Sequence, residues 1–147
     1  MTATYLAEVW QEKWQSSGFS APSLIQERVY PLLKSGQSVV GVSPTGSGKT
    51  LAYLLPLLET VKVGEGNQLL ILTSSQELAM QVTQVARDWA QLLDLQVLPL
   101  IGGANTKRQI EKLKAKPEVL VGTPGRVLEL IKLKKVKTQQ IHGVVLD

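Results

Sequence analysis

The spacing of apolar residues predicts two helices at the start of the chain. The first covers residues 5–16, where a leucine, a valine and two tryptophans share one face, and it ends at Gly18. The second begins at Pro22, is kinked or restarted at Pro31, and ends at Gly36.

From residue 38 onward, short apolar runs alternate with longer amphipathic segments. The runs lack polar alternation, so we expect strands that are covered on both faces. The intervening segments are long enough for crossover helices, which predicts an α/β fold with a mostly parallel sheet and helices on both faces. The predicted strands are residues 38–42, 69–72, 97–101, 119–121 and 144–146, and the predicted helices include 49–62 and 106–116.

Capping residues mark several of the helix starts. Ser74 and Glu77 have the spacing of a capping box in front of a long amphipathic helix. Asn105 can cap the basic helix that follows it. Thr123 is expected to cap a helix with Pro124 at its first position, where proline is well tolerated.

The composition limits the class of protein. A chain of 147 residues with 44% hydrophobic residues suits one folded domain, which we divide into N-terminal helices (1–36) and a βα core (37–147). The net charge of +4 fits a polyanionic partner only weakly. The sequence has no cysteine, which excludes disulfides and thiol catalysis and is compatible with the reducing cytoplasm. No signal peptide and no membrane-spanning run is predicted.

Residues 43–50, with the sequence S-P-T-G-S-G-K-T, form the most informative segment. Between two apolar runs they predict a strand, a phosphate-binding loop and a helix, with backbone N–H groups converging on phosphate oxygens. Ser43 stands where the strict pattern has glycine, and a glycine-rich turn with a solvated lysine is the alternative. The predicted nucleotide ligands are Ser43, Thr45, Gly46, Ser47, Gly48, Lys49 for the outer phosphates, and Thr50 for Mg²⁺.

Other polar clusters follow the remaining predicted strands. Ligands of parallel sheets gather at the carboxyl ends of the strands. The alternative is that these polar residues and glycines only form the turns that follow each strand. Asp147 can hold Mg²⁺. Residues 123–126 join a capping hydroxyl, backbone donors and a guanidinium, which suits a polynucleotide phosphate. An ordinary helix cap with a surface arginine is the alternative.

Taken together, these segments resemble the motifs of DEAD-box RNA helicases, in that family's order. Residues 18–26 (GFSAPSLIQ) resemble the Q motif, 43–50 motif I, 76–79 (QELA) the end of motif Ia, 102–103 the glycine doublet, 123–126 (TPGR) motif Ib, and 144–147 (VVLD) the strand that enters the D-E-A-D box.

The resemblance implies a RecA-like ATP-binding domain that uses ATP and Mg²⁺ and binds RNA. Gln26 would read the adenine edge and Phe19 would pack on the adenine ring; by themselves they read as a surface glutamine and a core phenylalanine. Lys49, Thr50 and Asp147 would serve catalysis. The RNA path would include Gln76, Gly102, Gly103, Thr123, Pro124, Gly125 and Arg126.

The sequence also departs from the family pattern. Gln76 replaces an arginine that would meet an RNA phosphate, which should weaken RNA binding. The glutamate that follows the first aspartate of the D-E-A-D box, motif III and the C-terminal helicase domain are not among the 147 residues. We therefore expect a fragment that binds ATP and ADP and hydrolyses essentially no ATP.

Two other functions are consistent with parts of the sequence. A non-catalytic RNA-binding or scaffold protein is favoured by Gln76. A DNA-directed helicase relative or another phosphate-loop ATPase is disfavoured by Gln26 together with residues 123–126. The lysines at 132, 134, 135 and 137 either extend the RNA path or form a solvated face, and His142 is expected to be structural.

Overall fold

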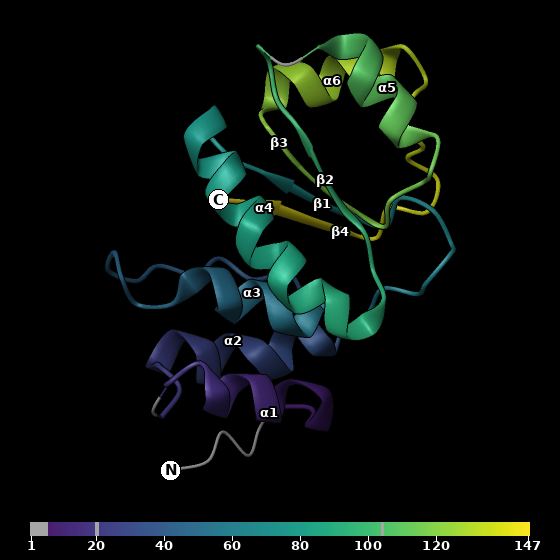
Figure 1. Ribbon diagram of the computed structural model, residues 1–147. Coiled ribbons are helices and arrows are strands. Elements are labelled where there is room, and N and C mark those ends of the chain that lie inside the picture. The colour runs from purple at the N-terminus through teal and green to yellow at the C-terminus, as the bar shows by residue number, and fades with distance from the viewer. Residues whose placement is uncertain (1–5, 20, 104) are drawn as a thin grey trace. The chain divides into compact units, whose positions relative to one another are not determined.

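The structure is a computed structural model that describes residues 6–19, 21–103 and 105–147. It divides into two compact units, residues 1–60 and 61–147 (Figure 1). Tyr5, at the start of the first predicted helix, and Ser20, within the segment that resembles the Q motif, lie outside the described residues. Among the described helices, none combines the length and the apolar character that a membrane crossing requires.

Three helices make up the described part of the first unit: α1 (Glu8–Ser16), α2 (Leu24–Lys34) and α3 (Lys49–Leu58). The expected restart at Pro31 is wrong, because α2 runs through this residue without a break. Pro31 lies only one turn from the end of the helix, and its carbonyl accepts a hydrogen bond from Ser35 N (3.1 Å), which closes that last turn. Gly36, with φ of +87°, then ends the helix as predicted.

Glu59 connects the helices of the first unit. Its carboxylate accepts hydrogen bonds from Trp10 Nε1 (3.0 Å) and from the Tyr30 hydroxyl, and it pairs with Lys34 Nζ (3.2 Å). Burial and the hydrogen bond to Glu59 raise the pKa of Tyr30 well above its usual range. The tyrosine is therefore a neutral donor at any physiological pH, which keeps α1 and α2 tied to the end of α3.

The predicted strand at residues 38–42 is not formed in this structure. Val40 and Val42 are 93% and 90% exposed, although the sequence placed them in a covered strand. A strand requires a neighbouring strand for its backbone hydrogen bonds, and the sheet in the described part of the chain does not include this segment.

The described part of the second unit contains a sheet of four parallel strands in the order β2-β3-β1-β4. In its register, Leu70 lies opposite Leu120 on one side and Val144 on the other. The parallel α/β fold expected from the sequence is thus confirmed. The strands are β1 (Leu69–Leu72), β2 (Val97–Leu100), β3 (Val119–Gly122) and β4 (Gly143–Leu146).

Helices cover both faces of the sheet, with α4 (Gln76–Ala90) on one face and α5 (Thr106–Leu113) and α6 (Pro124–Lys132) on the other (Figure 1). A short 3₁₀ helix, Gln91–Leu93, follows α4. Alternate strand residues such as Leu70, Leu100 and Leu120 join Leu113 of α5 and Leu130 of α6 in one buried cluster. Because side chains alternate along a strand, the residues between them face α4.

β4 differs from the other strands in its exposure. Val144 and Leu146 are 57% and 81% exposed, so the expectation that this strand is buried on both faces is wrong. β4 lies at one edge of the sheet and pairs only with β1 in the described structure, whereas β2, at the other edge, is buried because α4 and α5 pack on it.

The long helix α4 begins one residue later than the sequence predicted. Ser75 rather than Ser74 is the N-cap, and its hydroxyl accepts a hydrogen bond from Leu78 N (3.1 Å). The chain is still held to the sheet at Thr73, whose N–H donates to the Gly122 carbonyl (2.9 Å). The strand pairing therefore delays the start of the helix. By contrast, Asn105 caps α5 as predicted.

Candidate functional site

The predicted phosphate loop leads directly into α3 in the first unit. The chain turns at Gly46 and Gly48, both with φ of +82°, a conformation that favours glycine. Ser43 Oγ lies 2.7 Å from Ser47 Oγ, so the serine that replaces the usual glycine makes a hydrogen bond across the loop. The departure from the strict pattern thus has a local structural role.

The start of α3 presents backbone donors to an anion. The first helical hydrogen bond runs from Ala52 N to the Gly48 carbonyl (3.1 Å). The N–H groups of Lys49, Thr50 and Leu51 therefore have no partner within the helix, and they lie at its positive end. Lys49 is exposed and Thr50 half-buried, which leaves a mobile cation and a hydroxyl beside these donors.

Gln26 joins the start of α2 to this loop. It is buried, and its Oε1 accepts a hydrogen bond from Ser23 N (2.8 Å) while Ser23 Oγ accepts one from Gln26 N (3.4 Å), which forms a capping box. Its Nε2 donates to the Gly48 carbonyl (3.2 Å). The sequence pointed to Gln26 as an adenine reader, but it did not predict these three hydrogen bonds.

Phe19 lies on the surface rather than in the core. It is 45% exposed, and its ring meets the ring of the buried Trp14 edge-on at a centroid distance of 4.9 Å. An exposed aromatic ring on a fixed support is available to stack on a flat ligand. The structural alternative of a core phenylalanine is therefore wrong, and the adenine contact stays a prediction.

In the second unit, the parallel pairing of the strands brings four polar segments together at the carboxyl ends of the strands. These are the segments that follow β1, β2, β3 and β4, and three of them continue the ladder by one backbone hydrogen bond. The bonds are Thr73 N to the Gly122 carbonyl (2.9 Å), Thr123 N to the Leu100 carbonyl (3.2 Å) and Asp147 N to the Leu72 carbonyl (2.8 Å). The predicted gathering at the strand ends is confirmed for these four clusters.

Gln76 packs against the glycine doublet at these strand ends. A methyl group added to Gly102 would lie 3.3 Å from Gln76 Nε2, and one added to Gly103 would lie 3.5 Å from its Oε1. Gly103 also has a positive φ of +81°. The doublet therefore provides the space that the glutamine occupies, and a larger residue at Gly102 would crowd it.

Residues 123–126 open α6 beside the doublet. Thr123 occupies the N-cap position and Pro124 the first helical position, as predicted. The Thr123 hydroxyl makes no capping hydrogen bond with the first turn of α6, contrary to expectation. The free N–H groups of that turn and the hydroxyl are left for another acceptor.

The Arg126 side chain is held from two sides. Its Nη1 donates to Gln109 Oε1 (3.0 Å), and its Nε lies 3.7 Å from a carboxylate oxygen of Glu129. The side chain is 11% exposed, so it is not the freely solvated surface arginine of the alternative reading. The sequence did not identify Gln109, although one signal was present: it lies four residues before the buried Leu113, on the same face of α5.

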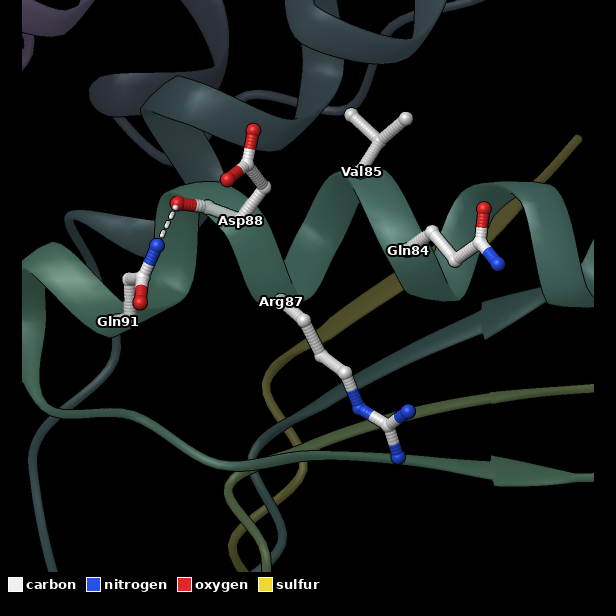
Figure 2. A pocket seen from close by; sticks show the side chains of 5 residues that line it. All are labelled: Gln84, Val85, Arg87, Asp88 and Gln91. Carbon is white, nitrogen blue, oxygen red and sulfur yellow. Dashed lines mark hydrogen bonds between the residues drawn. The ribbon is translucent and has the colours of Figure 1, made fainter.

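A surface hollow of about 550 Å³ on α4 lies outside these clusters (Figure 2). Figure 2 shows Arg87 reaching toward the strands, where its Nε donates to the Val97 carbonyl (3.2 Å), and Gln91 bonded to the Asp88 carbonyl (3.0 Å). Four of the five lining residues come from α4 and Gln91 comes from the 3₁₀ helix that follows it, and none belongs to a predicted site. The hollow therefore has no part in the phosphate or RNA sites.

The comparisons with known proteins agree with this geometry. The family model for the DEAD/DEAH box helicase matches residues 23–147. "Probable ATP-dependent RNA helicase YfmL" of Bacillus subtilis is 51% identical over 138 residues, which are 93% of this chain and 37% of that protein. "DEAD-box ATP-dependent RNA helicase CshC" of Bacillus cereus is 43% identical over 138 residues, 93% of this chain and 36% of that protein.

A solved structure shows the same fold. The crystal structure of a DEAD box protein from the hyperthermophile Methanococcus jannaschii matches with a TM-score of 0.90 and 32% identity, and the match covers 97% of this chain and 39% of that one. The RecA-like architecture expected from the resemblance is thereby confirmed. The chain spans a little over a third of the length of the curated relatives that it matches.

Proposed function

This chain belongs to the DEAD/DEAH box helicase family, and from that membership we propose that it is the N-terminal ATP-binding core of an ATP-dependent RNA helicase. The observation that carries the proposal is the hydrogen bond from Gln26 to Gly48, because it links an adenine-reading amide to the phosphate loop. We further propose that residues 1–147 act as one domain that a C-terminal helicase domain accompanies in the whole protein, and that the protein works in the cytoplasm.

The residues proposed to bind the nucleotide lie in the first unit, whereas Asp147, which we propose together with Thr50 for Mg²⁺, belongs to the second unit. ATP or ADP binds with its phosphates at the start of α3, where backbone donors and Lys49 supply positive charge. Gln26 reads the adenine edge, and Phe19 supplies the stacking ring. Mg²⁺ would neutralise phosphate charge, and the hydroxyl of Thr50 and the carboxylate of Asp147 are the hard oxygen ligands that suit it. Ser43, Thr45, Gly46, Ser47 and Gly48 complete the loop.

The proposed RNA surface lies at the carboxyl ends of the strands in the second unit. Gln76 lies against the glycine doublet and offers its amide to a phosphate there, and the start of α6 adds free N–H groups and the Thr123 hydroxyl. Arg126 supplies the positive charge. These groups meet sugar and phosphate rather than base edges, so we expect binding without sequence preference. The surface comprises Gln76, Gly102, Gly103, Thr123, Pro124, Gly125 and Arg126.

Catalysis would require more than these residues. Lys49, Thr50 and Asp147 hold the phosphates and the metal, but phosphoryl transfer also needs an oriented water and further positive charge. In the family resemblance these come from residues after Asp147 and from the C-terminal helicase domain. We therefore expect nucleotide and RNA binding by the 147-residue chain, and ATP hydrolysis with duplex unwinding only by the whole protein.

The direct test is calorimetric titration of the chain with ADP and with GDP. We expect ADP to bind more tightly by at least about tenfold, because guanine presents two acceptors, O6 and N7, where adenine presents the N6 donor and the N7 acceptor that a glutamine amide pairs with. Equal affinity for the two nucleotides would defeat the adenine assignment. A Gln26→Ala variant that binds ADP as tightly as the unmodified chain would do the same.

A non-catalytic RNA-binding or scaffold protein is the second candidate. The neutral Gln76 favours it, since the family's arginine at this position would add a charge-assisted contact to RNA. Measuring ATP hydrolysis by the whole protein with and without single-stranded RNA separates the two functions. RNA stimulation supports the helicase, and the absence of turnover in both conditions supports the scaffold. Stimulation by DNA in place of RNA would instead indicate a DNA-directed relative.

A further inference from the structure

Gln109 uses both ends of its side-chain amide in a buried position. It lies on α5, is 6% exposed, and donates from Nε2 to the Ile101 carbonyl (2.8 Å). Its Oε1 accepts a hydrogen bond from Arg126 Nη1 (3.0 Å). One side chain thus links the end of the β2 segment to the first turn of α6.

The two groups that Gln109 connects belong to two parts of the proposed RNA surface. Ile101 directly precedes the glycine doublet, and Arg126 carries the charge of the TPGR segment. The Arg126 guanidinium has five N–H donors, of which one is bonded to Gln109 while the Nε–H faces the Glu129 carboxylate at 3.7 Å. The remaining donors on the guanidinium can therefore face a phosphate while the bond to Gln109 fixes the plane of the group.

Holding an arginine in place before binding increases affinity. A long, flexible side chain loses conformational freedom when it binds a phosphate, and less is lost when the side chain is already fixed. The Gln109 bond to the Ile101 carbonyl also fixes the backbone that leads into the doublet. Both effects would hold the arginine and the doublet in place before RNA binds.

We propose that Gln109 is a positioning residue for RNA binding, which acts through Arg126 and the glycine doublet and does not touch RNA itself. The inference rests on the proposed RNA surface. If the glutamine only filled the space between α5 and the sheet, it would support folding, but it would not affect how much Arg126 contributes to RNA affinity.

A double-mutant cycle on the 147-residue chain tests this. The variants are Gln109→Met, which keeps the side-chain volume and removes the amide, Arg126→Ala, and both together. Binding of a fluorescein-labelled single-stranded decauridine RNA is followed by anisotropy between 50 and 200 mM KCl. We expect Arg126→Ala to raise Kd by about tenfold and to lower the salt slope by about one.

If Gln109 positions Arg126, a substitution of Gln109 that removes no charge should still change the salt dependence of the Kd for RNA. Gln109→Met should raise Kd by about three- to fivefold and lower the salt slope, although it removes no charge. In the Arg126→Ala background the same change should have no further effect, because the residue that it acts through is gone. Gln84→Ala, which truncates an exposed glutamine of α4, is the matched control and should leave Kd unchanged.

The outcomes separate the inference from the proposed function. If Arg126→Ala weakens RNA binding and Gln109→Met does not, or weakens it equally in both backgrounds, the positioning role is overturned and the RNA surface stands. If Arg126→Ala leaves RNA binding unchanged, the surface itself is wrong and the inference falls with it. Should Gln109→Met fail to fold, Gln109→Glu is the second variant, because it keeps an acceptor for Arg126. Arg126→Ala should then still weaken RNA binding in the Gln109→Glu background. If it no longer does, the inference is overturned.

Discussion

Gln26 Nε2 donates a hydrogen bond to the backbone carbonyl of Gly48, at a distance of 3.2 Å. The contact is so close that a methyl group added to Gly48 would collide with the Gln26 amide. The glycine is therefore required for two reasons, its positive φ and its approach to the glutamine. The phosphate loop and the proposed adenine reader consequently form one structural unit.

Gly48→Ala should damage both stability and nucleotide binding. The positive φ of +82° costs an alanine about 1–2 kcal/mol, and displacement of the Gln26 amide adds to this cost. Gly64→Ala is the matched control, since Gly64 has φ of +80° but open space around it. Urea denaturation should show a larger loss for Gly48→Ala. Equal losses would mean that the Gln26 contact contributes nothing.

Replacing Gln26 should separate its structural role from its binding role. Gln26→Glu keeps an acceptor for Ser23 N but loses the donor to the Gly48 carbonyl and places a charge in a buried site. We expect ADP affinity to fall by more than about tenfold in Gln26→Glu, and by a smaller factor in Gln26→Ala. Calorimetry with ADP measures both. An unchanged affinity in Gln26→Glu would remove the glutamine from the site.

The sequence predicted the sheet and the strand-end clusters because their signals are local. A short apolar run such as residues 119–121 identifies a buried strand, and the parallel topology then brings the segments after the strands to one edge. The same logic placed Thr123 and Arg126 correctly. The hydrogen-bond partners of these residues could not be predicted from the sequence, because partners that are distant in sequence leave no periodic signal.

Three features illustrate this limit. The Val40 segment has the composition of a strand, but pairing depends on a neighbour and not on composition. Proline breaks or kinks helices in general, yet α2 continues through Pro31 to Lys34. Gly122 ends β3, and no local pattern indicates that it lies against the Leu100 carbonyl.

Restoring the family's arginine at position 76 should strengthen RNA binding. Gln76 lies against the glycine doublet, so an arginine there would add a charge beside the proposed phosphate path. We expect Gln76→Arg to lower the Kd for single-stranded RNA by about tenfold and to steepen the salt slope by about one. Gln84→Arg adds the same charge to an exposed site on α4. An equal gain in both variants would indicate a net-charge effect without a local contact.

Tyr30 should make the protein less stable at alkaline pH. Its pKa is raised by burial and by the hydrogen bond to Glu59, so the folded state keeps the proton when the unfolded chain loses it near pH 10. The free energy of unfolding should therefore fall above that pH by about 1.4 kcal/mol per pH unit. Urea titrations from pH 8.5 to 11 measure this slope, and Tyr30→Phe should flatten it. Identical slopes in both proteins would contradict the assignment.

Gly122→Ala should destabilise the sheet where β3 passes β2 and α6. An added methyl group would meet the Leu100 carbonyl oxygen and would lie 2.7 Å from Val127 Cγ2. Backbone on one side and a buried valine on the other cannot yield easily, so we expect a loss of about 1–3 kcal/mol in thermal or urea unfolding. Gly125→Ala has open space and a helical position, and it should be neutral or slightly stabilising. A neutral Gly122→Ala would show that β2 and β3 can separate without cost.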